Sequence, residues 1–600
     1  MPARIIIARR KEAVRTEAYL PYLEQAVKLL PVLLSLLLLL RCIRSILSTG
    51  YGAETWATVR CGKESFPVTH WENVIGSARS ADIRIERESV RRTHAVLRRR
   101  DDGVWLVHDV FSRGGVSVDG KEPGAEGLAV TDGASICLGG TTLRFSEIGR
   151  KRHDDLEAER VAAGKRVSPV LTLLELTAFE GFLLWQHLDS SEGRTRLQIA
   201  LGFTVLILLE WFCYYAMRLI GRGGFEVETI AFYLTALGLS VTASASPDDM
   251  FRQILLILLS FSMFLVLGLW LRDLRRIEAS RLPAALLSLG LLVLSYFTAD
   301  PVNGAKSWLT IAGFSFQPSE LVKVAYLYAG AATLERLYRR RNLIVFIAFS
   351  ALCVGVLALL GDFGSALVFF VSFLVISFLR SGSIATVILA VSGATMAGFL
   401  AISVKPYIAR RFATWGHVWE DAFGTGYQQT RALSAAAAGG LFGKGAGAGW
   451  LKGIVAADTD MVFAVVCEEL GLIIALCSLL AIVALAFIAV LTARRARSAY
   501  YSIAACAAVT MLMTQTALNA FGSLDLLPFT GVTFPFVSRG GSSLLACWMM
   551  MAFIKGADTR REGSFVVKSP AQLFGLSDEK KRAGGAPSRI HRSKKGGLAR

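Results

Sequence analysis

The chain has 600 residues, of which 53% are hydrophobic and only 19% are charged. A soluble globular chain carries about 25% charged residues and has no interior large enough for this apolar fraction, so the composition excludes an all-soluble protein and a disordered one. The 65 lysines and arginines outnumber the 47 aspartates and glutamates. In a membrane protein such an excess collects in cytoplasmic loops, so we expect no nucleic-acid partner. The nine cysteines show no metal-binding spacing.

Residues 1–54 form a basic N-terminus followed by one apolar run. Arg41 and Arg44 interrupt that run after about twelve residues, short of the roughly 20 that span a bilayer. Residues 29–47 therefore form either a spanning helix with snorkelling arginines or a helix lying in the membrane interface. A span would place the basic N-terminus outside, against the positive-inside rule, so the interfacial helix is the favoured interpretation.

Residues 55–147 alternate apolar and polar side chains between glycine and aspartate turns. This pattern predicts a β-sandwich, followed by a basic linker over 148–168. The segment resembles a forkhead-associated (FHA) domain. The matching residues are Ile75-Gly76, Ser80 to Ile83, His94-Ala95, Leu97, Asp109, Ser112, Gly115 and Leu138-Gly139-Gly140.

The FHA resemblance implies binding of phosphothreonine peptides in the cytoplasm. The candidate phosphopeptide ligands are Arg79, Arg91, Arg92, Ser112 and Arg113. Ser77 and Gly114 stand where the family carries an arginine and an asparagine. Docking of a cytoplasmic protein without phosphothreonine is therefore the favoured interpretation, with binding of a phosphoprotein as the alternative.

From residue 169 onward, apolar runs of spanning length follow one another, which predicts a mainly α, polytopic membrane protein. The runs are 169–187, 196–220, 228–245, 252–271, 283–298, 319–335, 343–360, 363–379, 383–402, 462–490, 499–522 and 541–556. We divide them into extra transmembrane helices over 169–221 and a ten-helix core over 222–557, so two or three membrane helices precede the core.

Arginines crowd three connections of the helical region, 272–281, 336–341 and 494–497. The positive-inside rule makes these connections cytoplasmic, together with the sandwich and the basic tail 558–600. The loops left to face outward are 299–318, 403–460 and 524–540.

Two features of the residues point to a site near the outer loops. The 403–460 connection is far longer than a plain loop, and such loops are usually functional. Ionisable residues also lie in or beside apolar helices, where a charge is costly. Glu320 and Lys323 are three residues apart and form either a structural pair or a substrate contact. Asp362 is either a substrate contact or a helix N-terminal charge.

Residues 228–556 resemble the SEDS family (shape, elongation, division and sporulation; the RodA and FtsW type). The motifs that carry the resemblance stand in family order: Asn303-Gly304-Ala305 with Trp308; Gln317-Pro318-Ser319-Glu320 with Lys323; Gly361 to Ala366; Arg410-Arg411; Trp419-Glu420-Asp421 with Tyr427-Gln428; Gly440 to Gly445; Thr459-Asp460 with Glu468-Glu469; and Pro535 to Ser538 with Gly540 to Ser543.

The SEDS resemblance implies a peptidoglycan glycosyltransferase of the bacterial cytoplasmic membrane. It would polymerise lipid II at the outer face and release undecaprenyl pyrophosphate, in cell-shape or division wall synthesis, with a class B penicillin-binding protein as transpeptidase partner. Two other functions stay open, a flippase or transporter of lipid-linked precursors and a non-catalytic scaffold. A transporter should show repeated halves, which this sequence lacks. The family's essential aspartate is intact here as Asp460, which argues against a non-catalytic scaffold.

Asp460 occupies the family's essential aspartate position, as general base or metal-assisted base. A divalent cation, Mg²⁺ or Mn²⁺, would bind there. Arg410, Arg411 and Lys444 are the candidates for the diphosphate. The remaining substrate-binding candidates are Gln428, Trp308, Lys323, Glu320, Asp362, Ser538 and Ser542.

The sequence departs from the family pattern beside the essential aspartate. Asp458 stands where histidine is common, and Arg539 replaces the usual tyrosine. If Asp458 and Asp460 approach the same site, one of them should have a raised pKa.

Overall fold

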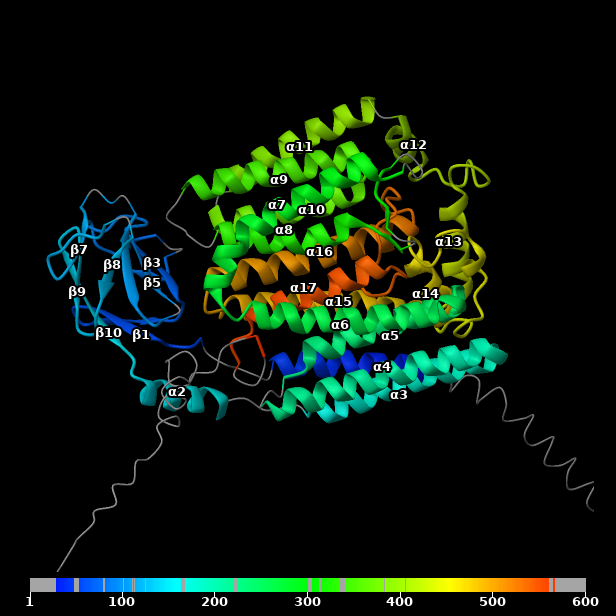
Figure 1. Cartoon of the computed structure of the whole chain (residues 1–600), viewed down its shortest axis with the longest axis horizontal. Helices are drawn as coiled ribbons and strands as arrows, with labels where there is room; N and C mark the ends of the chain where they lie inside the picture. The colour runs from blue at the N-terminus through cyan, green and yellow to red at the C-terminus, as the bar shows by residue number, and fades with distance from the viewer. Residues whose placement is uncertain are drawn as a thin grey trace, which may run out of the picture. The chain divides into compact units, whose positions relative to one another are not determined.

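The computed structural model describes residues 28–47, 53–78, 81–100, 102–110, 112, 114–124, 126–162, 168–220, 224–300, 305–311, 314–334, 340–381, 384–404, 406–560 and 565–566. These residues form two compact units (Figure 1). One unit is the β-rich part over Thr55–Ala158, and the other is helical and includes the segment that ends at Glu54 and the chain from Glu159.

The β-rich unit is a sandwich of two five-stranded sheets, as the alternating pattern predicts. One sheet has the order β2-β1-β10-β9-β7 and the other the order β4-β3-β5-β6-β8. The strands are β1 (Ala57–Cys61), β2 (Glu64–Val68), β3 (Glu72–Gly76), β4 (Ile83–Arg84), β5 (Ala95–Arg99), β6 (Trp105–Asp109), β7 (Val116–Val118), β8 (Leu128–Val130), β9 (Ser135–Leu138) and β10 (Thr141–Glu147). Alternate residues face the core, where Val59, Val107 and Phe145 are completely buried. Part of the predicted linker is helical, as α2 (Arg150–Ala162).

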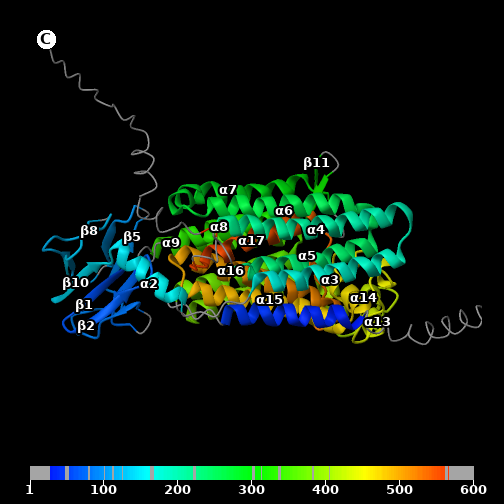
Figure 2. The same ribbon diagram turned by 90° about the horizontal axis from the view of Figure 1, so that it is seen from below.

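The helical unit is a bundle in which long apolar helices run side by side (Figures 1 and 2). Its helices are the N-terminal helix Lys28–Leu47, α3 (Pro169–Ser190), α4 (Gly193–Leu219), α5 (Glu226–Ala245), η1 (Pro247–Asp249), α6 (Met250–Trp270), α7 (Leu274–Thr298), α8 (Pro318–Leu334), α9 (Arg340–Leu360), α10 (Phe363–Ser381), α11 (Ile384–Val404), α12 (Pro406–Thr414), α13 (Tyr427–Gly439), η2 (Leu451–Gly453), α14 (Val462–Leu470), α15 (Leu472–Ala493), α16 (Ala499–Ser523) and α17 (Gly541–Ala557). A short hairpin, β11 (Leu309–Ile311) and β12 (Phe314–Phe316), precedes α8.

Within the described residues, eight helices are long and apolar enough to cross a membrane. The centre of the bundle includes α5, most of whose residues are buried, and Trp548 of α17 packs edge-on against Phe232 of α5 with 4.9 Å between ring centroids. The prediction of a mainly helical, multi-span protein with a β-sandwich is therefore confirmed.

Two predicted helix boundaries are wrong. The apolar run 462–490 is two helices, α14 and α15, because the backbone breaks at Gly471 with φ +90°. A side chain at Gly471 would collide with the Leu441 carbonyl oxygen, which lies 2.4 Å from an ideal Cβ. Helix α7 begins at Leu274 rather than near residue 283, so most of the arginine-rich segment is helical. The Asp273 side chain caps it by accepting from the Arg275 N–H at 3.1 Å.

The N-terminal helix Lys28–Leu47 contradicts the interfacial interpretation. It is long and apolar enough to cross a membrane, and it runs along the bundle in both views (Figures 1 and 2). Arg41 lies 2.7 Å from Glu175 of α3, and Leu38 and Cys42 are buried. The ion pair neutralises Arg41, one of the two arginines that interrupt the apolar run. The helix packs lengthwise against the bundle instead of lying flat on a surface (Figures 1 and 2).

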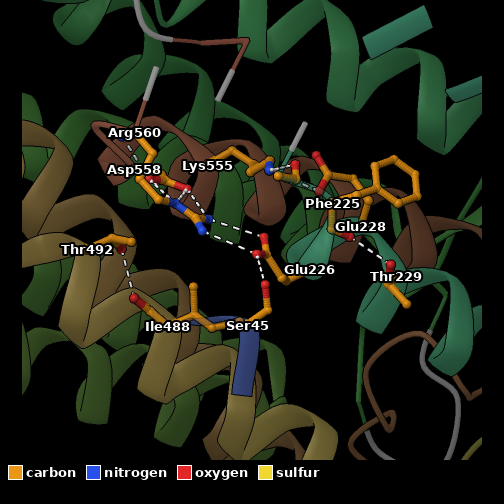
Figure 3. A network of polar contacts seen from close by, with 11 residues as sticks. Ser45, Phe225, Glu226, Glu228, Thr229, Ile488, Thr492, Lys555, Asp558 and Arg560 are labelled. Carbon is orange, nitrogen blue, oxygen red and sulfur yellow. Dashed lines mark hydrogen bonds and ion pairs between the residues drawn. The ribbon is translucent and has the colours of Figure 1, made fainter. Parts of the chain in front are cut away.

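A buried network of charged and polar groups joins this N-terminal helix to the start of α5 and to the chain that follows α17 (Figure 3). The Arg560 guanidinium donates to Glu226 with both distances 3.2 Å, and the Ser45 hydroxyl donates to the same carboxylate at 2.7 Å. Beside them, Lys555 lies 3.0 Å from Glu228, and both side chains are 1% exposed. Paired charges of this kind can be buried because each one has a partner.

Candidate active site around Asp460

Asp460 lies in the turn between η2 and α14 and is held from three sides. Its backbone N–H donates to the Ala456 carbonyl at 2.9 Å. Asn519 of α16 donates from Nδ2 to the backbone oxygens of Asp460 at 3.0 Å and Val532 at 2.8 Å. Gly531, with φ +67°, approaches the carboxylate so closely that a Cβ there would lie 3.1 Å from Oδ2 of Asp460. The backbone at Asp460 is therefore fixed by segments far apart in the sequence, and Gly531 limits the space beside its carboxylate.

The environment of Asp460 raises the pKa of its carboxyl to about 6. Burial is the largest cause, because it disfavours the charged form. A hydrogen bond from the Thr459 side chain and the positive charge of Arg411 act in the opposite direction, and the negative charge of Asp458 raises the pKa by the smallest contribution. The pKa of Asp460 is therefore raised, but mainly by burial, and the repulsion from Asp458 that the sequence suggested contributes least.

Asp458 is not a second unpaired carboxylate beside Asp460, because it forms an ion pair with Arg539. Nε of Arg539 lies 2.6 Å from Oδ2 of Asp458, and the Arg539 backbone N–H donates to the Asp458 carbonyl at 2.8 Å. The Ser246 hydroxyl donates to the same carboxylate at 3.2 Å, and Arg539 also pairs with Asp249 of η1. The two departures from the family pattern are thus partners of each other.

Two of the predicted substrate residues, Ser538 and Arg411, act near Asp460 in different ways. Ser538 is buried, and its hydroxyl donates to the Thr459 carbonyl at 2.6 Å while accepting from the Phe534 N–H at 2.8 Å. It supports the backbone beside Asp460. Arg410 and Arg411 lie exposed on α12, and Arg411 donates to the Thr530 carbonyl at 3.4 Å. Among the diphosphate candidates, Arg411 carries the charge that lowers the pKa of Asp460.

Lys444 lies in the glycine-rich loop, defined here as residues 440–453, and is ion-paired. Its Nζ donates to Oε1 of Glu468 at 2.7 Å, with 32% of the side chain exposed. The same carboxylate accepts from the backbone N–H groups of Trp450 at 3.1 Å and Leu451 at 2.9 Å. Gln428 donates to the Val455 carbonyl at 3.0 Å.

A second cluster of predicted residues surrounds Asp362 at the start of α10. Its carboxylate accepts from the Ser365 N–H at 3.0 Å, as an N-cap does. It also accepts from Nε2 of Gln317 at 3.1 Å and from the Ser319 hydroxyl at 3.2 Å. The Ser542 hydroxyl accepts from the Gln317 N–H at 3.2 Å. The geometry favours the helix-capping interpretation of Asp362.

Glu320 and Lys323 form a buried pair inside α8. Their charged atoms lie 2.8 Å apart, with 3% and 0% of the side chains exposed. This favours the structural interpretation over a substrate contact. Trp308 is 41% exposed and remains accessible to a ligand.

In the sandwich, Arg91 and Arg92 are exposed, whereas the Ser112 backbone N–H donates to Asp109 at 3.0 Å. Arg79 and Arg113 lie outside the described residues, as do Asn303-Gly304 and most of the basic tail 558–600. His94 is completely buried and contacts the Arg91 N–H and the Gly115 carbonyl, both at 3.1 Å. It therefore ties two loops of the scaffold together.

The sequence analysis did not single out Asn519, Gly531 or Asp249. Asn519 could have been predicted from the sequence to be a functional or structural residue, because a side-chain amide in an apolar helix needs hydrogen-bond partners. Gly531 and Asp249 carry no such signal in the sequence, and only the fold brings Gly531 to Asp460 and Asp249 to Arg539. Among the described residues, no group of three or more His, Cys, Asp or Glu side chains could hold a metal ion.

Comparison with known proteins follows the same division of the chain. Residues 227–562 match the family model of FtsW, RodA and SpoVE, described as "Cell cycle protein", and residues 73–139 match the FHA domain. The chain is 32% identical over 272 residues to the peptidoglycan glycosyltransferase RodA of Mycobacterium tuberculosis, an alignment that covers 42% of this chain and 57% of that protein. This chain therefore spans little more than half the length of that relative.

Other relatives match over more of their length. The probable peptidoglycan glycosyltransferase FtsW of Borreliella burgdorferi is 26% identical, over 54% of this chain and 91% of that protein. The crystal structure of Thermus thermophilus RodA is 25% identical, with a TM-score of 0.42 over 55% of this chain and 94% of that chain. The chain thus belongs to the FtsW, RodA and SpoVE (SEDS) family, as a distant relative of the RodA and FtsW glycosyltransferases, and carries an FHA domain ahead of the family region.

Proposed function

We propose that the protein is a peptidoglycan glycosyltransferase that polymerises lipid II at the outer face of the bacterial cytoplasmic membrane, in cell-shape or division wall synthesis. The observation that supports this most is the setting of Asp460, whose carboxyl has a pKa of about 6 in the presence of the Arg411 charge and whose backbone carbonyl accepts from Asn519. A base with this pKa is mostly ionised at neutral pH and still accepts a proton.

In this mechanism Asp460 takes the proton of the acceptor sugar hydroxyl as that oxygen forms the new glycosidic bond. The bond between the donor sugar and its diphosphate breaks at the same time, and undecaprenyl pyrophosphate leaves. Arg411, with Arg410 beside it on the exposed face of α12, would stabilise the negative charge of the departing diphosphate.

A divalent cation fits one part of this site. Proteins often hold Mg²⁺ through one or two carboxylates together with substrate phosphates, and Asp460 is one such carboxylate. Asp460 would be the residue that holds Mg²⁺ or Mn²⁺ there. When bound, the cation would supply charge neutralisation for the leaving group.

The proposed partners are a class B penicillin-binding protein, which would cross-link the new glycan, and a cytoplasmic protein that docks on the FHA domain. The FHA domain's exposed Arg91 and Arg92 offer positive charge to an acidic or phosphorylated partner.

The test is polymerisation of purified lipid II by the full-length chain and by Asp460→Ala, with and without a transpeptidase. General-base removal should lower the rate about 10²- to 10⁴-fold. Equal glycan synthesis by both proteins would refute the role of Asp460. Transfer of lipid II across a liposome bilayer without polymerisation would instead establish a transporter.

A further inference from the structure

The end of helix α3 contacts the glycine-rich loop, although α3 (Pro169–Ser190) lies outside the family region 227–562. The backbone N–H of Ala446 donates to Oε1 of Gln186 at 2.9 Å. The next residue, Gly447, has φ +78°, and a Cβ there would lie 2.9 Å from Oγ of Ser190 and 3.3 Å from Nδ1 of His187. The apex of the loop therefore packs directly on the last turn of α3.

The opposite side of the same loop is held by α14. The Gly447 N–H donates to Oε2 of Glu469 at 2.9 Å, and the Lys444 N–H donates to the Glu468 carbonyl at 3.0 Å. The ion pair between Lys444 and Glu468 adds a third connection. The loop thus lies between two helices, one from the family region and one that this chain adds.

The end of α3 is itself fixed to the core. Nε2 of His187 lies 2.8 Å from the Ser240 hydroxyl of α5 in a buried contact. One turn farther along α5, the Ser244 hydroxyl donates to Oε1 of Glu469, the residue that holds Gly447. Helix α3, α5 and α14 therefore form one continuous support for the loop.

We propose that Gln186 is a positioning residue of the glycosyltransferase site. Helix α3 holds the glycine-rich loop in the geometry that binds the diphosphate of the lipid substrate. Lys444, the candidate diphosphate ligand of this loop, lies two residues before Ala446, which donates the hydrogen bond to Gln186. The inference rests on the proposed function. Gln186 touches no reacting atom; it acts through the backbone of Ala446. Without its acceptor, the Ala446 N–H would lose its partner and the apex would be free to leave α3.

Two variants of the full-length protein separate this role from general stability. Gln186→Leu keeps the side-chain size and removes the acceptor, whereas Gln186→Glu keeps an acceptor at the same place. Trp185→Leu, an exposed neighbour on the same turn (50% exposed), is the matched control. All three variants should unfold at the wild-type temperature.

The first measurement is amide hydrogen exchange of residues 440–453, which does not depend on activity. Gln186→Leu should speed exchange of the Ala446 amide about tenfold, while Gln186→Glu and Trp185→Leu should exchange like wild type. The second is polymerisation kinetics with purified lipid II. Gln186→Leu should raise KM about tenfold with kcat within about twofold, and Gln186→Glu should restore KM.

Unchanged exchange in Gln186→Leu would overturn the contact itself. Faster exchange with an unchanged KM would overturn the positioning role, and so would a Gln186→Glu variant as impaired as Gln186→Leu. A wild-type protein that shows no polymerisation would refute the proposed function, and the positioning role in the reaction with it, while the exchange data would still decide whether Gln186 holds the loop.

Discussion

The guanidinium Nε of Arg539 lies 2.6 Å from the carboxylate of Asp458, two residues before Asp460. Each of these residues departs from the SEDS pattern, in which histidine and tyrosine are usual. Because the two replacements form an ion pair, they add no net charge beside Asp460. The pair links the turn that carries Asp460 to the segment before α17.

Removing one partner of this ion pair should lower the free energy of unfolding more than replacing both partners together. Asp458→Ala leaves Arg539 half-buried beside Asp249, and we expect it to lower the free energy of unfolding by about 2 kcal/mol. The family-type double variant Asp458→His with Arg539→Tyr should lose less than the sum of its two single variants, by about 1–2 kcal/mol. A double-mutant cycle on thermal unfolding measures this coupling, and strict additivity would show that the pair is not coupled.

The polymerisation rate should depend on the ionisation of Asp460. The pKa of its carboxyl is about 6, so kcat should fall as the pH drops through 6, because a protonated carboxyl cannot accept a proton. Arg411→Gln removes a positive charge that lowers this pKa, so the acid limb should move to higher pH. The position of the limb in a pH–rate profile checks this.

Arg410→Gln is the control for that shift, since Arg410 is not among the charges that move the pKa of Asp460. It should lower the rate without moving the limb. A limb that stays near pH 6 in Arg411→Gln would contradict the electrostatic contact.

Arg560 and Ser45, which both donate to Glu226 (Figure 3), should contribute unequally to the free energy of unfolding. Arg560→Ala removes the charge that compensates a buried carboxylate, and we expect a loss of about 3 kcal/mol in the free energy of unfolding. Ser45→Ala removes one hydrogen bond of 2.7 Å and should cost about 1 kcal/mol. Unfolding in detergent measures both, and equal losses would contradict the buried ion pair.

The N-terminal helix should place Lys28 on the same side of the membrane as the glycine-rich loop. Its other end contacts Glu226 through Ser45, at the end of α5 opposite to Ser240 and Ser244, which adjoin α3 and Glu469. In a cysteine-free background, Lys28→Cys should react with an impermeant thiol reagent added outside intact cells.

The two reference positions for that experiment are Thr425, exposed before α13, and Arg494, exposed after α15. Thr425→Cys should be labelled from outside and Arg494→Cys only after lysis. Protection of Lys28→Cys alongside labelling of Thr425→Cys would restore the interfacial interpretation.

The FHA domain should not require phosphothreonine. Ser77 and Gly114 replace the family's phosphate ligands, and the buried His94 serves the scaffold. We expect matched peptide libraries with and without phosphothreonine to bind the full-length chain equally, within about twofold. A preference of tenfold or more that Arg91→Ala abolishes would show phosphothreonine recognition.

The sequence by itself determined the mainly helical, multi-span character of the chain and the sandwich. A bilayer leaves backbone groups no partner outside the helix, so spans must be continuous apolar runs, and a half-buried strand must alternate. The same logic failed at Gly471, because hydropathy does not register a backbone break at a glycine with φ +90° that the Leu441 carbonyl approaches closely. It also failed at residues 28–47, where Glu175 compensates Arg41 from another helix.

Only the tertiary structure decided how the candidate residues are arranged. Motif order identified Asp460, but its pKa depends on burial and on Arg411, 49 positions away in the chain. The Asp362 carboxylate accepts from Gln317, Ser319 and the Ser365 N–H, and Lys323 pairs with Glu320 at 2.8 Å, which favours structural roles for these residues. Local sequence patterns report periodicity and cost of burial, whereas the pairing of Asp458 with Arg539 and of Gln186 with Ala446 arises where distant segments meet.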